Sequence, residues 1–370
     1  MSNSELPKGW STKALCEVVE NFIDYRGKTP KKTLFGVPLI TAKVVKNGKI
    51  LEPNEFIHNN DYKSWMTRGF PRINDVVLTT EAPLGEVALI KDSNVALAQR
   101  IITMRCYPDI MDNIFLKYYL QSEQGQYELD SRASGTTVFG IKASVLKNMP
   151  VSFPPLAEQK AIAEVLSSLD DKIDLLHQQN QTLEDMAQTL FREWFIEKAD
   201  EGWEAGLFSD LVDVSSGKTL KRTFFDDNGI YKVLGANGKI GRTNEWLIDE
   251  KVIFTGRVGT LGKVFINKDK AWLSDNTLII RPKRHFYYIY FLVVSFGLEN
   301  YNVGSTQPLI RQSDLKNIDI NIPPIELTEK FESIAKDIFS KIEINQQQIK
   351  TLEQTRDTLL PKLMSGQVRV

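Results

Sequence analysis

The sequence has few of the residues that carry most catalytic and metal chemistry. Its 370 residues include only two cysteines and three histidines. Cys16 and Cys106 form no CxxC motif, and His58, His177 and His285 are far from one another in the sequence. This composition excludes a disulfide framework and provides no cluster typical of a zinc site. We therefore expect no metal site, no catalytic residue and no bound cofactor.

The sequence also lacks a long apolar run. The longest, residues 286–298, includes Ser295 and Gly297 and is too short to cross a bilayer, so we expect a buried helix there. Residues 1–5 lack the basic and then apolar order of a signal peptide. These absences predict a protein with no membrane association that works in the cytoplasm.

The sequence also has no large excess of basic or acidic side chains, since the net charge is −1. That value argues against a simple basic nucleic-acid binder, but the charge is uneven along the chain. Residues 1–155 carry 19 basic and 16 acidic side chains, a net +3, and residues 200–324 carry 16 and 15, a net +1. Residues 156–199 carry 4 and 9, a net −5. The two mildly positive segments are compatible with DNA binding.

About half of the sequence is repeated. Gly-Trp at 9–10 returns at 202–203, and Gly-Lys-Thr at 27–29 returns at 217–219. From Gly135 onward the two copies keep a constant offset of 169 residues without a gap, so that Phe-Pro-Pro-Leu at 153–156 becomes Ile-Pro-Pro-Ile at 322–325. A repeat of this length indicates two related modules rather than a short-period solenoid.

Each copy begins with strand-like sequence and ends with helical sequence. Val/Ile/Thr runs broken by Gly, Pro and Asn predict strands, with one helical patch at 113–129. Residues 157–198 and 325–360 contain no Pro or Gly. We therefore expect an α+β protein with two tandem mixed α/β modules, separated and joined by two long helices. The expected boundaries are 1–155 and 200–324 for the modules, and 156–199 and 325–370 for the helices.

The long helices have the apolar spacing of a coiled coil. The spacing alternates between four and three residues over more than four heptads in each helix. The seam positions are Ile162, Leu166, Leu169, Ile173, Leu176, Asn180, Leu183, Ala187, Leu190 and Trp194 in one helix, and Phe331, Ala335, Ile338, Ile342, Asn345, Ile349, Leu352, Arg356, Leu359 and Leu363 in the other.

Two asparagines in this seam favour an antiparallel pairing. A parallel pairing would set Asn180 and Asn345 against apolar residues and leave both amides without a partner, at about 1–3 kcal/mol each. An antiparallel register in which facing numbers sum to 525 sets Asn180 against Asn345. Buried Asn pairs are known devices for fixing register. Only Leu169 against Arg356 fits this register poorly.

The enzyme motifs that we sought are incomplete. A phosphate-binding P-loop needs a glycine five residues before Gly-Lys, and Phe22 and Val212 occupy those places. The glycines of 256–262 have the wrong spacing for a dinucleotide-binding loop. The Pro-Pro pairs follow Phe153 and Ile322, without the Asn of an amino-methyltransferase motif, and no nuclease cluster of Asp, Glu and Lys stands out.

Basic and hydroxyl-bearing loops remain as the candidates for function. Such side chains contact phosphates and base edges, and neighbouring glycines allow the backbone to approach DNA. Hydroxyl-rich turns at 134–137 and 304–306 each lead to a basic residue. The alternative is that these are ordinary solvated loops. Our candidate DNA-binding residues are Lys28, Lys31, Lys32, Arg100, Lys142, Lys218, Lys221, Arg222, Arg257 and Arg311.

The whole chain resembles the specificity subunit of type I restriction–modification systems. The resemblance rests on the opening Gly-Trp, the Gly-Thr-Leu-Gly of 259–262, the Phe-Pro-Pro-Leu-Ala-Glu-Gln-Lys of 153–160, and the Leu-Leu-Pro-Lys-Leu-Met-Ser-Gly of 359–366. It implies that each module is a target recognition domain reading half of a split site in double-stranded DNA. It also implies that the helices act as a spacer that docks modification (methyltransferase) subunits, and that a restriction subunit joins them.

Two other classes remain as alternatives. A DNA methyltransferase or nuclease fused to its own recognition domains would need the cofactor motif that is missing here. A coiled-coil adaptor without a DNA role would not need two large β-rich modules, and its failure to bind a duplex column would distinguish it. Base-reading residues do not transfer from the resemblance, so the candidate residues rest on their chemistry alone.

Overall fold

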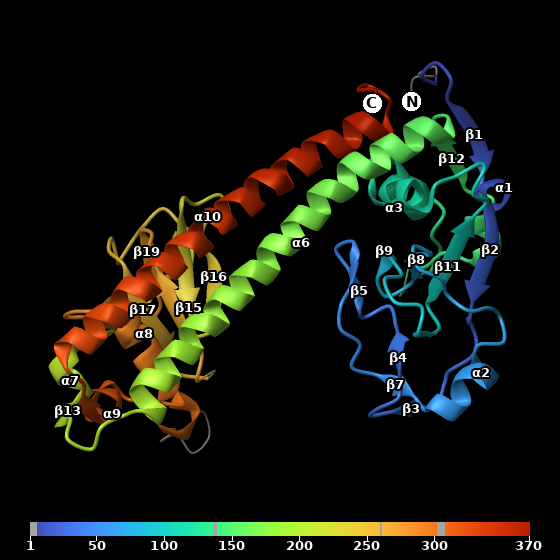
Figure 1. The fold of residues 1–370 in the computed structure, drawn as a ribbon. Coiled ribbons are helices and arrows are strands. Elements are labelled where there is room, and N and C mark those ends of the chain that lie inside the picture. Colours follow the sequence, from blue (N-terminus) through green and yellow to red (C-terminus); the bar gives the residue numbers. More distant parts are fainter. Residues whose placement is uncertain (1–5, 136–138, 260, 302–307) are drawn as a thin grey trace. The chain divides into compact units, whose positions relative to one another are not determined.

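The computed structural model describes residues 6–135, 139–259, 261–301 and 308–370. The chain folds into two compact units (Figure 1). The first unit is Met1–Leu176 with Gln348–Val370, and the second unit is His177–Gln347. Two long helices, α6 (Leu156–Arg192) and α10 (Ile325–Met364), each contribute residues to both units. Each unit therefore combines a β-rich module with a stretch of both helices.

The first unit is built on two four-stranded sheets. One is antiparallel with strand order β2-β11-β8-β9, and the other is mixed with order β10-β4-β7-β3. Its elements are β1 (Ser11–Ala14), α1 (Leu15–Val18), β2 (Val19–Asp24), β3 (Lys32–Thr33), β4 (Val37–Ile40), β5 (Val45–Lys46), β6 (Lys49–Ile50), β7 (Phe56–Ile57), η1 (Asn59–Asp61), α2 (Tyr62–Trp65), β8 (Val76–Thr80), β9 (Leu84–Leu89), β10 (Ala96–Leu97), β11 (Ile101–Cys106), α3 (Asn113–Gln121), α4 (Glu123–Asp130), α5 (Ala143–Lys147) and β12 (Pro150–Phe153).

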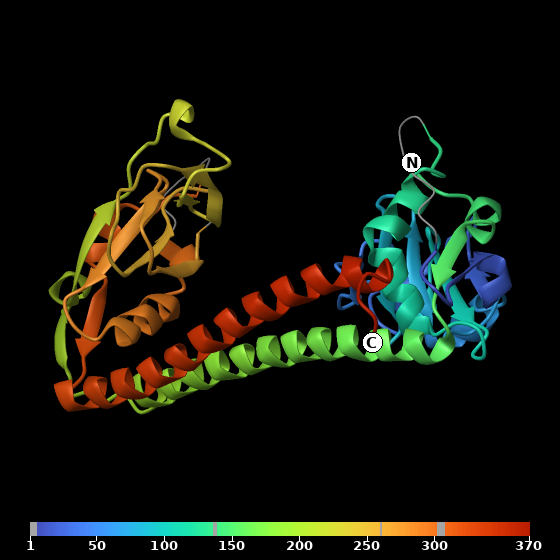
Figure 2. The ribbon, with the colours of Figure 1, turned by 90° about the horizontal axis from the view of Figure 1, so that it is seen from above.

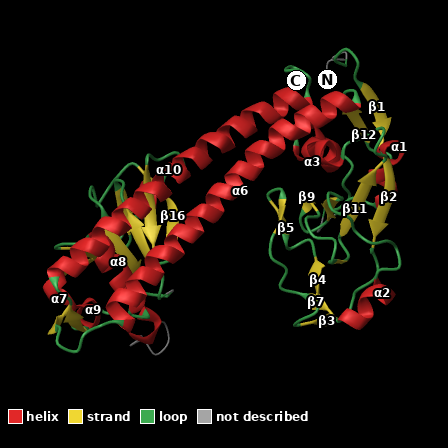
Figure 3. Ribbon diagram, viewed as in Figure 1, coloured by secondary structure: helices red, strands yellow, loops and turns green. Residues whose placement is uncertain are grey.

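The second unit repeats this plan with a smaller second sheet. Its sheets have the strand orders β14-β20-β17-β18 and β16-β15-β19. Its elements are η2 (Glu193–Glu197, a π-helical turn), β13 (Glu204–Leu207), α7 (Phe208–Leu211), β14 (Val212–Ser216), η3 (Arg222–Phe224), β15 (Tyr231–Gly235), β16 (Gly238–Thr243), β17 (Val252–Gly256), β18 (Val264–Asn267), β19 (Ala271–Leu273), β20 (Thr277–Pro282), α8 (Phe286–Ser295), η4 (Leu298–Tyr301), α9 (Gln312–Lys316) and β21 (Asp319–Ile322). Figure 3 shows the mixture of helices and strands in each unit.

The central strands have continuous apolar sequence because both of their faces are buried. In the first unit Val76 and Leu78 of β8 pack into the core shared with α3, whereas Val77 between them packs into the core shared with the second sheet. In the second unit Ile253 of β17 belongs to the core shared with α8, and its neighbours Val252 and Phe254 belong to the other core. The expected apolar run at 286–298 accordingly forms the mostly buried helix α8.

Within the first unit, α6 and α10 pair in the antiparallel sense. Ile173 and Leu176 of α6 form one apolar cluster with Ile349 and Leu352 of α10, as a register summing to 525 requires. Arg356, the poor fit in that register, is accommodated because it turns its guanidinium to Asp170, whose Oδ1 accepts a hydrogen bond from Nη1 at 3.0 Å. The side-by-side course of these helix segments can be followed in Figure 2.

The second unit holds the asparagine layer. Asn345 Nδ2 donates to Asn180 Oδ1 at 2.9 Å, and both residues are buried. Near the end of α6, Trp194 lies against Phe331 with 6.4 Å between ring centroids. The antiparallel register therefore applies within this unit too. Across the two units, all twenty seam positions are buried or half-buried.

Helix α10 continues through a proline and ends six residues before the expected boundary at residue 370. Pro361 lies inside the helix, which ends at Met364. An interior proline costs about 3 kcal/mol because it lacks the amide hydrogen. Leu363 and Met364 beyond it are 1% and 2% exposed in the core of the first unit, and burying two such side chains stabilises by about 1.5–3 kcal/mol each. The burial of Leu363 and Met364 thus offsets the cost of the proline inside the helix. Among the described residues, no helix combines the length and apolar character needed to cross a membrane.

Candidate nucleic-acid interface

In the first unit, three loops meet at one end of the antiparallel sheet. Strands β2 and β8 end there, while β9 and β11 begin there. The Thr80 amide donates to the Arg100 carbonyl at 2.8 Å, and the Ile141 amide donates to the Thr80 carbonyl at 2.9 Å. The backbone therefore brings Arg100 and the turn before α5 to the end of β8.

The second unit repeats these hydrogen bonds. The Arg257 amide donates to the Asn276 carbonyl at 2.8 Å, and the Ile310 amide donates to the Arg257 carbonyl at 2.9 Å. Arg257 thus occupies the place of Thr80, and the repeat in the sequence agrees, since Leu84-Gly85 follows Thr80 at the same spacing as Leu261-Gly262 follows Arg257. The same three-loop junction exists in both units, although the side chains differ.

Glycine is required in the same place in both junctions. Gly85 has φ +91° and Gly262 has φ +88°. A Cβ on Gly85 would lie 2.6 Å from Gln126 Oε1, and one on Gly262 would lie 2.5 Å from Glu299 Oε2. The left-handed backbone and the close side chains both disfavour any other residue. Gly85 and Gly262 therefore have the same backbone conformation in the two units.

The candidate residues of the first unit are all exposed, but their settings differ. Lys28 and Lys31 lie in the segment after β2 without an ion pair among the described residues. Lys32 belongs to strand β3 rather than to the loop, and its Nζ lies 2.9 Å from Glu55. Arg100, at φ +70°, has its Nε 3.1 Å from Glu81. Lys142 precedes α5 at its N-cap position.

Arg26 reinforces this junction although it was not among the candidates. Its Nη2 donates to the Ile141 carbonyl at 3.0 Å, linking the segment after β2 to the turn before α5. Its place beside Gly27 in a run of basic residues is the signal by which the sequence could have pointed to it.

In the second unit, Lys218, Lys221 and Arg222 are exposed in the segment after β14. The Lys218 backbone is held by hydrogen bonds, since its amide donates to the Leu273 carbonyl at 2.9 Å and its carbonyl accepts from Trp272 Nε1 at 2.7 Å. Lys218 therefore has a fixed backbone and a free side chain, which suits a contact with phosphate.

Arg257 and Arg311 complete the set in the second unit. Arg257 is half-buried, and its Nε has no hydrogen-bond partner among the described residues. Arg311 is exposed at the N-cap of α9, the position that corresponds to Lys142 at the N-cap of α5. Of the predicted hydroxyl-rich turns, residues 136–137 and 304–306 lie outside the described residues.

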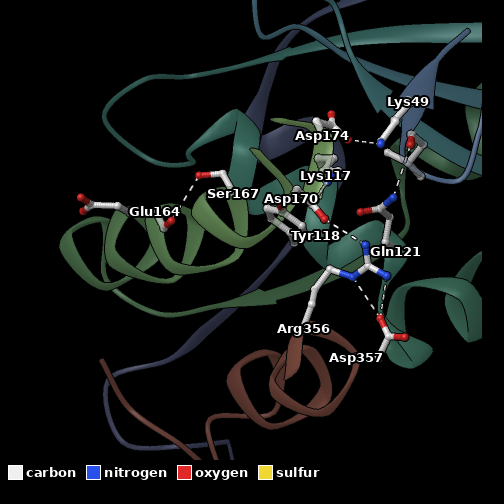
Figure 4. Close-up of polar contacts among 11 residues, drawn as sticks. Lys49, Lys117, Tyr118, Gln121, Glu164, Ser167, Asp170, Asp174, Arg356 and Asp357 are labelled. Atoms are coloured by element: carbon white, nitrogen blue, oxygen red, sulfur yellow. Dashed lines mark hydrogen bonds and ion pairs between the residues drawn. The ribbon is translucent and has the colours of Figure 1, made fainter. Parts of the chain in front are cut away.

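A second cluster, missed by the sequence reasoning, fastens the first module to the helices (Figure 4). The Asp170 carboxylate of α6 accepts hydrogen bonds from Lys117 Nζ at 2.9 Å and Tyr118 Oη at 2.6 Å, besides that from Arg356. Lys117 is only 5% exposed, and its Nζ lies 3.7 Å from the centroid of the Tyr118 ring. A lysine within the apolar sequence of α3 was the available signal.

The electrostatics of this cluster follow from burial and pairing. Burial lowers the pKa of Lys117 although Asp170 opposes the shift. Burial alone would raise the pKa of Asp170, but Lys117, Tyr118 and Arg356 together lower it. Burial and the nearby Asp170 both raise the pKa of Tyr118. At neutral pH the Asp170 carboxylate is therefore charged and the Tyr118 phenol is neutral.

The second unit uses aromatic packing at the corresponding place. The offset of 169 places Phe339 at the position of Asp170. When residues 115–120 of α3 are matched with residues 287–292 of α8, Ile289 takes the position of Lys117. The Phe339 ring stacks on Tyr287 with 4.4 Å between centroids. In addition, the amides of Tyr287 and Tyr288 donate to Glu332 Oε2 of α10 at 2.8 and 3.1 Å. The two modules are therefore joined to the helices by different chemistry.

Among the described residues, no group of three or more His, Cys, Asp or Glu side chains could hold a metal ion. The sheet-end junctions instead carry basic side chains, among them Arg100 and Lys142 in the first unit and Arg257 and Arg311 in the second. Those groups can bind phosphate and base edges, and they match the inventory of a nucleic-acid interface.

Comparisons with known proteins identify the family to which the chain is similar. The family model described as the type I restriction modification DNA specificity domain matches residues 7–185 and again residues 200–354. The chain is 28% identical to the type I restriction enzyme MjaIX specificity subunit of Methanocaldococcus jannaschii, over 99% of this chain and 95% of the relative. It is 25% identical to the MjaVIII specificity subunit of the same organism, over 80% of each chain.

The fold also has a counterpart among solved structures. The crystal structure of the type I restriction-modification system S subunit from M. genitalium superposes with a TM-score of 0.61 at 18% identity. The match covers 97% of this chain and 98% of that one. At this identity the likeness concerns the fold, including two β-rich modules and long helices.

Proposed function

The chain belongs to the family of type I restriction–modification specificity subunits, and from that premise we propose how its residues recognise DNA. Each module, within residues 1–155 and 200–324, reads one half of a bipartite duplex site. The sheet-end junctions described above face the DNA in this proposal, and the ten candidate basic residues make its phosphate and base contacts.

One observation carries this proposal, namely the repeated junction with divergent side chains. The hydrogen bonds around Thr80 and Arg257 are the same, and so are the left-handed glycines. The side chains at the equivalent places differ, because Thr80 is buried whereas Arg257 is half-buried and carries a guanidinium. A constant backbone frame with variable polar side chains is what two readers of different half-sites need.

We further propose that catalysis resides in partner subunits and that the helices dock them. The family's naming as specificity subunits supports the division of labour, and the broad exposed faces of α6 and α10 outside the seam are available to partners. In this proposal, modification subunits bind the helices and a restriction subunit joins the assembly. The purified chain, incubated with a labelled methyl donor and duplex, should then give only background counts.

The experiment that tests the reading role is sequencing of methylated bases in cells with and without this chain. A bipartite motif should be methylated only in cells that have the chain together with its modification subunits. Replacing Lys218 or Arg257 by alanine should weaken recognition of the half-site that the second module reads, and should leave recognition of the other half-site unchanged. Methylation that is independent of the chain would refute the proposed function.

A further inference from the structure

A nine-residue segment that ends in an exposed apolar tip occurs once in each module. Residues 27–35 read Gly-Lys-Thr-Pro-Lys-Lys-Thr-Leu-Phe, and residues 217–225 read Gly-Lys-Thr-Leu-Lys-Arg-Thr-Phe-Phe. The two align without a gap, and six of the nine positions are identical. Both begin just beyond an equivalent strand, β2 or β14. The proposed phosphate contacts use the basic residues of these segments but give the apolar tips no role.

In the first unit the tip projects into solvent from a rigid turn. Leu34 is 91% exposed and Phe35 is 72% exposed. Thr33 Oγ1 donates to the Phe35 carbonyl at 2.8 Å. Gly36, at φ +131°, closes the turn so tightly that a Cβ there would lie 2.1 Å from the Ile57 carbonyl oxygen. The backbone thus holds two large apolar side chains in water, which no folding requirement explains.

In the second unit the tip is shaped differently but has the same composition. Phe224 is 48% exposed at the end of η3, and its amide donates to the Lys221 carbonyl at 3.0 Å. The neighbouring Phe225 lies against β16, because a Cβ on Gly241 would be 2.8 Å from Phe225 Cδ1. Phe225 is therefore anchored, while Phe224 remains the more exposed ring.

The charge around both tips identifies the kind of partner. Each segment contains three basic residues and no acidic residue, although Lys32 is paired with Glu55 from outside its segment. A polyanion with apolar surface fits such a segment, and duplex DNA offers both in its phosphates and its bases. A docking site for another protein would not need the same cations beside the tip in two modules of otherwise different sequence.

We propose that Leu34 and Phe35 in the first module, and Phe224 in the second, make apolar contacts with the bases of the two half-sites. This inference rests on the proposed function and deepens it. Two kinds of base contact are compatible with such tips, namely contact with a thymine methyl group and insertion at a partly unstacked base step. Both bury an apolar side chain against a base. The lysines of the first segment, and the lysines and arginine of the second, bind the flanking phosphates.

The test separates apolar contacts from charge contacts by their response to salt. The whole complex with modification subunits is titrated with a labelled duplex that carries the methylated motif, at low and high salt. Phosphate contacts weaken with salt because bound counterions are released, whereas burial of an apolar side chain is not linked to that release. The Leu34→Ser/Phe35→Ser variant should lose about tenfold or more in affinity at both salt concentrations, with an unchanged salt slope.

Two matched variants provide the controls. Lys31→Ala should lose affinity mainly at low salt and reduce the salt slope by about one. Ile73→Ser removes an apolar side chain that is 60% exposed at the other end of β8, and it should leave the DNA affinity unchanged. Phe224→Ser should weaken binding in the same salt-independent way, but only on duplexes whose second half-site is intact.

The DNA itself distinguishes the two kinds of base contact. Replacing thymine by uracil should reproduce the loss if the tip contacts a methyl group, while 2-aminopurine should brighten if the tip unstacks a base step. Wild-type DNA affinity in the tip variants would overturn the inference, and failure of those variants to retain modification subunits would identify a protein-docking surface instead. If Lys31→Ala and Arg257→Ala also bound normally, the proposed DNA interface itself would fail.

Discussion

Replacing Asp170 tests how the first module is fastened to the helices. The carboxylate accepts hydrogen bonds from Lys117, Tyr118 and Arg356. Asp170→Leu would leave the Lys117 ammonium, which is 5% exposed, without its counter-ion. Removing one member of a buried pair costs about 3–5 kcal/mol. Because the Asp170 side chain is 21% exposed, we expect the lower end, about 3 kcal/mol.

A second substitution shows whether the loss comes from the stranded charge. The double variant Lys117→Met/Asp170→Leu removes the buried charge, so most of the lost stability should return. The second unit, where Phe339 stacks on Tyr287 at the corresponding place, shows that apolar packing can serve there. The assay is urea unfolding at neutral pH, with hydrogen exchange of the α3 amides reporting on the first unit. Asp171→Leu, an exposed neighbour, is the control and should change stability by no more than about 0.5 kcal/mol.

The pH dependence gives an independent check with a definite sign. Burial lowers the pKa of Lys117 from its ordinary value of 10.5, and removing Asp170 removes a group that raises it. Between the lowered folded pKa and 10.5, the unfolded chain binds more protons than the folded chain, so stability rises with pH. The deficit of Asp170→Leu should therefore shrink as the pH rises toward 10.5. A deficit that is constant with pH, or simply additive losses in the double variant, would refute the reasoning.

Three further predictions concern the modules and helices. Exchanging residues 1–155 for those of a relative should change one half of the methylated motif, and a change in both halves would contradict independent reading. Asn180→Leu should destabilise by about 1–3 kcal/mol, and adding Asn345→Leu should recover much of this in a double-mutant cycle measured by thermal unfolding. If the helices space the modules, one heptad added to each should lengthen the pair by ~10 Å at ~1.5 Å per residue. Since DNA rises about 3.4 Å per base pair, the preferred gap between the half-sites should grow by roughly three base pairs, as measured by selection from a library of gap lengths. An unchanged gap would show that the helices do not set the spacing.

Local patterns in the sequence were sufficient for the helices and for the repeated plan. Heptad spacing determines which face of a helix is apolar, and an antiparallel register lets the two asparagines bond to each other. Asn180 and Asn345 indeed share a hydrogen bond of 2.9 Å. The repeat likewise indicated that Arg257 belongs to a loop equivalent to residues 80–85, because duplicated sequence keeps its backbone frame.

Tertiary structure alone decided how individual charges are used. Arg356 looked misplaced in the seam, since its partner Asp170 lies off the seam on the other helix and more than 180 residues away in sequence. No prediction was made for Lys117, yet it is buried and its Nζ donates to Asp170 of α6. Lys32 and Arg100 are ion-paired with Glu55 and Glu81. The pKa of a side chain and its freedom to reach a ligand depend on neighbours brought together by folding, whereas periodicity depends only on residues that are close in the chain.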